Sequence, residues 1–211
     1  MSDTKSIMDD VSAYYTDKLK SFGNTPKGVD WPDHKGQLLR FDQLSKLFGD
    51  EDSFSVCDIG CGYGAFADYV RSGYEDAKYV GIDLSKAMVE ASRSKFLDVE
   101  GVEFAIASKP PNPVDFCVAS GIFNVRLKHS DEAWENWILE SLDTMNKFSI
   151  RGFAFNALTS YSDKELMRPD LYYADSKELF DVCKRKYSRN VALLHDYDLY
   201  EFTILVRKYD G

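Results

Sequence analysis

The chain has 211 residues and a formal net charge of −9, and hydrophobic residues make up 44% of it. A chain of this length folds as one domain with a sizeable core, and its 14 Phe and 13 Tyr residues argue against disorder. The negative charge disfavours contact with a nucleic-acid backbone. The densest basic run, residues 184–189, follows a helix-like stretch and fits a solvated helix end.

The sequence has neither a signal-peptide pattern nor a run of about 18 apolar residues. We therefore expect a cytosolic protein without membrane contact, and its oligomeric state stays open. The cysteines form no CxxC pair and lie in expected strands or a helix, which favours reduced thiols without a disulfide or a metal. They are Cys57, Cys61, Cys117 and Cys183.

Residues 1–50 contain two helical segments, at 12–21 and 35–48, on either side of the Gly/Pro-rich stretch FGNTPKGVDW. This segment is too small for a core of its own, so we expect a helical lid on a domain formed by 51–211. Within that domain the expected strands are 54–59, 79–82, 102–106, 114–120, 152–158, 191–194 and 199–206. The expected helices are 64–72, 85–96, 131–148 and 176–186.

The alternation of strands and helices is typical of βαβ units, which form parallel sheets covered by helices on both faces. Residues 195–198 alone separate the last two strands, and a connection this short makes an antiparallel hairpin. We therefore predict an α/β fold with a doubly wound, mostly parallel seven-stranded sheet that ends in an antiparallel hairpin.

The run VCDIGCGYGAF, residues 56–66, places Gly60, Gly62 and Gly64 after an expected strand and at the start of a helix. Glycines there allow a tight turn and the close approach of a ligand to the backbone. Asp83 lies nineteen residues beyond Gly64, at the end of the second strand, where a carboxylate can accept both hydroxyls of a ribose. Together these residues indicate an adenosine-containing ligand.

Two classes of cofactor fit this pattern, because Gly60, Gly62 and Ala65 also satisfy the dinucleotide fingerprint G-x-G-x-x-G/A. Asp58 separates the two classes. An anionic side chain is unhelpful beside a pyrophosphate, whereas it suits a ligand that carries an ammonium and a sulfonium. The alternative for Asp58 is a polar residue that merely ends the strand.

The run VCDIGCGYGAF followed by YVGIDLSKAM resembles the first two motifs of the class I S-adenosylmethionine-dependent methyltransferases. The resemblance covers roughly residues 54–208 and implies methyl transfer from S-adenosylmethionine. It also implies that Asp58 and the turn from Gly60 through Cys61 and Gly62 to Gly64 surround the methionine part of the cofactor. Asp83 and Leu84 would hold the ribose and the adenine.

Related enzymes often carry an Asp after the third strand, where this sequence has Ser108. We therefore expect Ser108 and backbone groups to contact the adenine. By the same resemblance, the end of the fourth strand borders the methyl-transfer pocket, so Ser120, Phe123 and Asn124 are candidate neighbours of the sulfonium and the acceptor. Asn124 is the best catalytic candidate among them, with a turn or capping role as its alternative.

Other candidates lie near the ends of the later strands. His195 follows the sixth strand at the edge where open α/β sheets bind ligands, so it is a candidate general base or an ordinary turn residue. The segment 158–175 follows the fifth strand, where loops often form substrate walls, although a loop packed on its own domain is the alternative. Its candidates are Tyr161 for catalysis and Arg168, Tyr172 and Tyr173 for substrate binding.

In the lid, Trp31 is a candidate for substrate contact, and Arg40 is a candidate partner of the methionine carboxylate or an ordinary surface group. His34 and His129 are expected on the surface. We expect the acceptor to be a small molecule methylated on oxygen or nitrogen rather than carbon. The alternatives are a protein or nucleic-acid methyltransferase, a nucleotide-binding module without catalysis, and an NAD enzyme.

Overall fold

The computed structural model describes residues 3–208. Its helices are α1 Asp3–Phe22, η1 Pro26–Val29, α2 His34–Ser45, α3 Ala65–Gly73, α4 Lys86–Lys95, α5 Asp131–Phe148, η2 Lys164–Leu166 and α6 Ser176–Lys186. Its strands are β1 Ser55–Ile59, β2 Lys78–Asp83, β3 Val102–Ile106, β4 Val114–Ala119, β5 Ser149–Leu158, β6 Asn190–Leu194 and β7 Glu201–Arg207.

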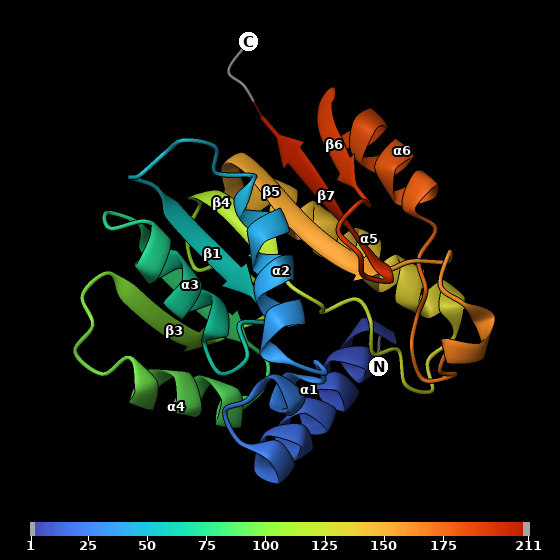
Figure 1. Ribbon diagram of the computed structural model, residues 1–211, viewed down its shortest axis with the longest axis horizontal. Helices are drawn as coiled ribbons and strands as arrows, with labels where there is room; N and C mark the ends of the chain where they lie inside the picture. The colour runs from blue at the N-terminus through green and yellow to red at the C-terminus, as the bar shows by residue number, and fades with distance from the viewer. Residues whose placement is uncertain (1–2, 209–211) are drawn as a thin grey trace.

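The seven strands form one sheet in the order β3-β2-β1-β4-β5-β7-β6. Strands β1 to β5 pair in parallel, and β7 runs antiparallel to both β5 and β6, which confirms the predicted fold and its terminal hairpin. The chain turns to one side of β1 for β2 and β3 and to the other side for β4 (Figure 1). This reversal creates a crevice at the carboxyl ends of β1 and β4, where open α/β sheets bind their ligands.

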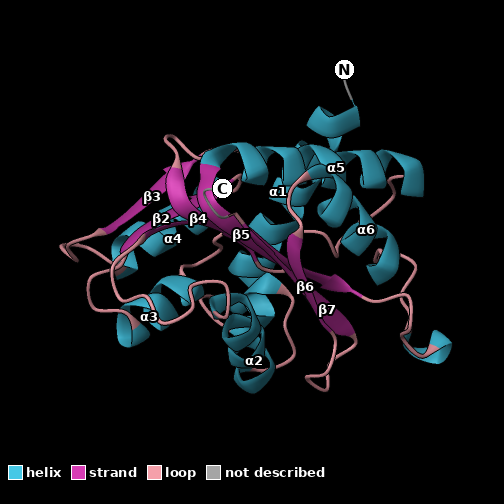
Figure 2. Ribbon diagram, turned by 90° about the horizontal axis from the view of Figure 1, so that it is seen from above, coloured by secondary structure: helices cyan, strands magenta, loops and turns pink. Residues whose placement is uncertain are grey.

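Helices cover both faces of the sheet, with α5 and α6 on one side and α2 and α3 on the other (Figure 2). Each strand contributes side chains to the packing on both faces of the sheet, because successive side chains point to opposite faces. In β5, Phe153 and Phe155 join the cluster under α5 and α6, whereas Ala154 between them joins the cluster under α2 and α3. Burial on both faces explains why the central strands are almost uniformly apolar.

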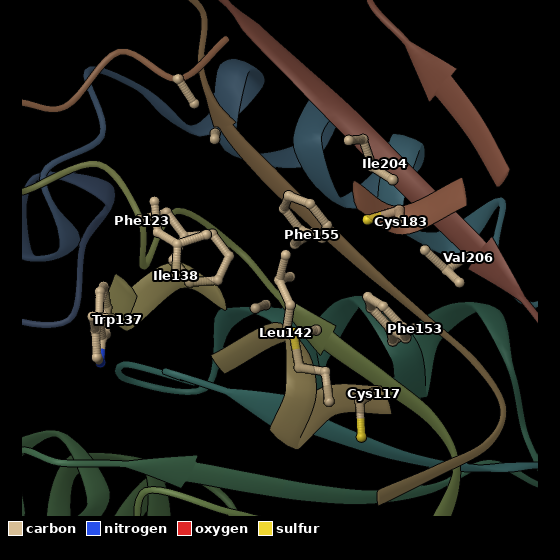
Figure 3. Packing of buried hydrophobic residues seen from close by; sticks show 14 of the residues in the cluster. Cys117, Phe123, Trp137, Ile138, Leu142, Phe153, Phe155, Cys183, Ile204 and Val206 are labelled. Atoms are coloured by element: carbon tan, nitrogen blue, oxygen red, sulfur yellow. The ribbon is translucent and has the colours of Figure 1, made fainter. Parts of the chain in front are cut away.

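The larger apolar cluster lies between α5 and the sheet, and Figure 3 shows its packing. Phe123 and Phe155 meet edge to face with ring centroids 5.6 Å apart, and Trp137 meets Phe123 at 5.7 Å. The apolar side of α5 is buried against the sheet. Its members are Trp134, Trp137, Ile138, Leu142 and Met145.

Side-chain caps fix where α4, α5 and α6 begin. Ser85 accepts a hydrogen bond from the backbone N–H of Met88 at the start of α4, and Asp175 accepts one from Lys177 at the start of α6. Ser130 does the same for α5. Each cap satisfies a backbone donor that has no partner inside the helix, and the caps at Ser85 and Asp175 confirm the predicted helix starts.

The first helix is longer than the sequence predicted, because α1 begins at Asp3 rather than near residue 12. Its first half is polar apart from a few positions, so periodicity alone gives a weak signal there. Ile7 and Val11 are nevertheless buried in the same cluster as α5. The tertiary contact therefore extends the helix beyond the predicted segment.

All four cysteines are buried and free. Among residues 3–208, no helix is both long and apolar enough to cross a membrane.

Truncating Phe155 to alanine is expected to lower the free energy of unfolding by about 3–5 kcal/mol, because the residue is fully buried and would leave a cavity. Ile150→Ala in the same strand is the matched control, since Ile150 is 59% exposed, and it should change the free energy of unfolding by less than about 0.5 kcal/mol. Urea denaturation measures both. Equal effects of the two substitutions would contradict the packing of β5 against α5.

Candidate active site

A cleft lies over the carboxyl ends of β1, β2 and β4. It consists of two adjoining cavities of about 810 and 320 Å³, counting the open space at their mouths. The residues that line both cavities are Val29, Trp31, Gly60, Gly62 and Ser120. The cleft therefore follows the glycine turn after β1, with the end of β4 on one side and the lid above it.

Asp58 lies in β1 directly before the turn and lines the smaller cavity. One of its carboxylate oxygens accepts a hydrogen bond of 2.6 Å from the Tyr79 hydroxyl, and the other is buried without a partner among the described residues. Burial, with a smaller contribution from nearby Asp83, raises the pKa of Asp58 to about 7 against the opposing hydrogen bond from Tyr79. A buried carboxylate oxygen without a partner suits a cationic group of a ligand.

Asp83 ends β2 and lines the larger cavity beside Leu84. Its carboxylate accepts hydrogen bonds from the backbone N–H groups of Gly62, at 3.0 Å, and Ser85, at 2.8 Å. Burial raises the pKa of Asp83 above its ordinary value, while these hydrogen bonds lower it. The carboxylate thus ties the glycine turn to the start of α4 and keeps lone pairs free for the hydroxyl groups of a ligand.

The end of β4 forms the facing wall of the cleft. Ser120 lines both cavities, and its buried hydroxyl has no partner in the described part of the chain. Gly121 and Ile122 continue this wall along the larger cavity. Phe123, in contrast, is fully buried in the core, which corrects the prediction that it borders the reacting groups.

The segment after α1 closes the cleft by packing on two glycines. A Cβ atom at Gly62 would lie 2.9 Å from Cγ1 of Val29, and one at Gly121 would lie 2.3 Å from Cζ2 of Trp31. Both glycines also have positive φ angles, of 54° and 74°. Larger residues at either position would therefore hold the lid away from the floor of the cleft.

Helix α1 forms the roof of the larger cavity with four residues, of which sequence reasoning placed only Tyr15 in the lid. They are Met8, Val11, Ser12 and Tyr15. The helix is seated on the loop after β2, because Ser12 donates a hydrogen bond to the carbonyl of Leu84 and Thr16 shares one with Ser85. Met8, Val11 and Tyr15 have the spacing of apolar residues on one face of a helix. This spacing is the sequence signal that could have predicted an earlier start of the helix.

The cleft gathers most of the predicted cofactor residues and one predicted substrate residue. They are Asp58, Gly60, Cys61, Gly62, Asp83, Leu84, Ser108, Ser120 and Trp31. Gly64 does not line either cavity. It precedes α3, and a Cβ atom there would lie 2.9 Å from the Phe96 ring, so this glycine serves the packing of α3 and α4 against the sheet.

The three predicted catalytic residues lie outside the walls of the cleft. Asn124 is buried and accepts a hydrogen bond of 3.0 Å from the backbone N–H of Leu158, so its side chain joins the segment after β4 to the end of β5. His195 and Tyr161 are exposed, with ring centroids 5.9 Å apart. His195 follows β6, the edge strand, which three strands separate from β1, and it lines neither cavity, so the structure gives no support to a general base there.

The side chains predicted to bind substrate after β5 form contacts with other residues of their own domain. Arg168 pairs with Asp170 and approaches Asp30 of the lid at 3.7 Å. The hydroxyl of Tyr172 donates to Glu135, and that of Tyr173 accepts from the backbone N–H of Arg168. Neither tyrosine nor Arg168 lines the cleft, so the prediction of a substrate wall is replaced by a loop packed on its own domain.

Two lid predictions also change. Arg40 does not reach either cavity, because its guanidinium forms a buried pair with Glu201 at the start of β7. His34 is exposed as predicted, but the side chain of His129 is only 10% exposed and lies 3.1 Å from a carboxylate oxygen of Asp10 in α1. The expectation of a surface position for His129 is therefore wrong, because α1 extends far enough to cover it.

Comparisons with known proteins agree with this geometry. The model of the Methyltransferase domain family matches residues 56–143. Rv1506c of Mycobacterium tuberculosis, whose name classes it as a methyltransferase, is 55% identical over 157 residues, which are 74% of this chain and 95% of that protein. The chain belongs to the methyltransferase family, and it shares its fold with a methyltransferase solved with S-adenosylmethionine bound.

Two further similarities are more distant. The ubiquinone biosynthesis O-methyltransferase of Alkalilimnicola ehrlichii is 34% identical over 76 residues, which are 36% of this chain and 30% of that enzyme. The crystal structure of magnesium protoporphyrin IX methyltransferase from Synechocystis PCC 6803 with bound S-adenosylmethionine has a TM-score of 0.66. That match is 15% identical and covers 99% of this chain and 98% of the other, so it shows the shared fold.

Replacing Asp58 by asparagine is expected to change how stability depends on pH. The pKa of Asp58 rises from 3.8 to about 7 on folding, so between those values the folded protein holds a proton that the unfolded chain releases. The contribution of Asp58 to stability is therefore full below about pH 4 and is lost as the pH rises through 7.

Asparagine does not titrate, so Asp58→Asn serves as the reference. The free energy of unfolding of the wild type minus that of Asp58→Asn should fall by on the order of 4 kcal/mol between about pH 4 and pH 8. Urea denaturation at several pH values, without cofactor, measures this difference. A difference that does not change with pH would show that folding does not raise the pKa of Asp58, contrary to its buried position.

Proposed function

We propose that the cleft holds S-adenosylmethionine along the glycine turn and that the enzyme methylates a small acceptor without negative charge, on oxygen or nitrogen. One observation carries this proposal: the charged side chains that line the two cavities, among the described residues, are the carboxylates Asp58 and Asp83. Asp58 lines the smaller cavity and Asp83 lines the larger one.

The residues of the cleft fit the cofactor. The unpartnered oxygen of Asp58 and the smaller cavity suit the ammonium end of the methionine part, with Gly60 and Gly62 allowing close approach. Asp83 is placed to accept the ribose hydroxyls, and Leu84 and Ser108 line the larger cavity where an adenine would lie. Ser120 offers a hydroxyl without a partner in the described chain where the two cavities meet.

The charge of the cleft favours a neutral or cationic acceptor. An anionic acceptor would approach two carboxylates, and Arg40 and Arg168 do not offset them, because they are paired with Glu201 and Asp170. Tyr15, Trp31 and Trp137 supply aromatic surface for a planar or apolar molecule. The relative named as a ubiquinone biosynthesis O-methyltransferase supports oxygen as one of the acceptor atoms.

When bound, S-adenosylmethionine supplies an electrophilic methyl group on a positively charged sulfur. The protein then has to hold the acceptor in line with that group and to exclude water, and it needs no covalent nucleophile. Val29 and Trp31 serve both purposes, because they close the cleft directly over the glycine turn and the end of β4.

Thermal stabilisation by S-adenosylmethionine, S-adenosylhomocysteine and NAD tests the cofactor site. At about 100 times its dissociation constant, each sulfur cofactor should raise the melting temperature by on the order of 5–10 °C, and NAD should not. Asp83→Ala should remove most of the shift. Asp76→Ala is the matched control, because Asp76 is exposed just before β2. A larger shift with NAD would refute the assignment of the glycine turn.

Methyl transfer to paired acceptors tests the charge preference. Each pair is a phenol or aromatic amine and its carboxylated or phosphorylated analogue, assayed with radiolabelled cofactor. The uncharged member is expected to have a kcat/KM at least about tenfold higher, because the anion would be placed close to carboxylates in a poorly solvated cleft. Preference for the anionic member would contradict the proposed acceptor class. Cofactor binding with no transfer to any acceptor would favour a nucleotide-binding module.

A further inference from the structure

Arg40 and Glu201 form a buried ion pair next to the cleft. The Nε and Nη2 atoms of Arg40 in α2 donate to the two carboxylate oxygens of Glu201 at 2.8 and 2.7 Å. The two side chains are only 7% and 1% exposed. Removing two charges from water is costly even when they are well paired, so such a pair is weak support for a purely stabilising role.

The pair is part of a closed ring of contacts. Glu201 also accepts a hydrogen bond of 2.6 Å from the side-chain amide of Asn156 in β5, and Asn156 accepts one of 2.7 Å from the backbone N–H of Gly121. Gly121 in turn lies directly against the Trp31 indole. The ring closes because the Arg40 guanidinium carbon lies 3.8 Å from the centroid of that same indole.

Trp31 is thus held between a cation and a glycine backbone. It is also the one side chain of the ring that lines both cavities of the cleft, beside Ser120. Asn156 and Glu201 come from the carboxyl edge of the sheet, where the end of β5 pairs with the start of β7. Trp31 and Arg40 come from the segment before β1, so the ring joins the lid to the far half of the sheet.

We propose that Arg40, Glu201 and Asn156 are positioning residues that hold the Trp31 indole as a fixed wall of the cleft and thereby set how long the cofactor product stays bound. A guanidinium stacked on an indole away from water is a strong contact, and Glu201 fixes the plane of that guanidinium through two parallel hydrogen bonds. Glu201 also neutralises the cation, so Arg40 positions Trp31 without attracting anions. The effect on cofactor retention rests on the proposed binding of S-adenosylmethionine in the cleft.

The test uses Trp31→Ala and the double variant Arg40→Met/Glu201→Met. Replacing both partners avoids leaving a buried charge unpaired, so the double variant keeps its fold where Glu201→Gln alone could lose it. Arg151→Met/Glu51→Met is the matched control, because that ion pair is partly exposed and joins β5 to the turn before β1. Urea denaturation verifies that each variant is folded.

The first readout is the dissociation rate of S-adenosylhomocysteine by stopped-flow displacement. It should rise by about tenfold in Trp31→Ala and in the double variant, and stay at the wild-type rate in the control. Combining the two changes should add little, because both remove the same wall. A folded double variant with the wild-type dissociation rate would overturn the proposal.

The second readout is hydrogen exchange of residues 25–33 without any ligand, which does not depend on the proposed function. Exchange should be about tenfold faster in the double variant than in the wild type and the control. Unchanged exchange would show that the ring does not hold the lid segment. Faster exchange in a protein that fails to bind S-adenosylhomocysteine would instead support the ring and refute the cofactor site.

Discussion

The structure depends on the reversal of the chain at β1. The chain leaves β1 toward β2 on one side and later returns to β4 on the other, so no connection covers the carboxyl ends of these neighbouring strands. Asp58 and the glycine turn follow β1 into that crevice, Asp83 flanks it from β2, and Ser120 flanks it from β4. Helix α1 and the segment after it then close the crevice from above.

Electrostatics give the cleft its character. Burial leaves Asp58 with one oxygen unpartnered among the described residues, a cost that a cationic ligand group would offset. Arg40 and Arg168 are paired with carboxylates outside the walls of the cleft. A negative, partly aromatic cleft results, and it suits a sulfonium cofactor with an acceptor that brings no negative charge of its own.

The sequence predicted the fold well, and most of the residues that it assigned to the cofactor line one cleft, because both rest on local patterns. Strand and helix periodicity, the caps at Ser85 and Asp175 and the glycine turn are each readable within a few residues. The acceptor side was predicted poorly. Asn124, His195 and Arg168 lie at plausible points of the chain, yet the structure binds or directs each of them away from the cleft.

The sequence by itself determined the order of strands and helices, the position of the glycine turn and the acidic residues beside it, because hydrophobic periodicity and backbone requirements act over short distances. Only the tertiary structure decided which side chains meet across the cleft. Trp31, Arg40, Asn156 and Glu201 are brought together from opposite ends of the chain. Contacts such as that between Arg40 and Glu201, which are 161 positions apart, depend on how the layers pack, and a single sequence carries no local signal for them.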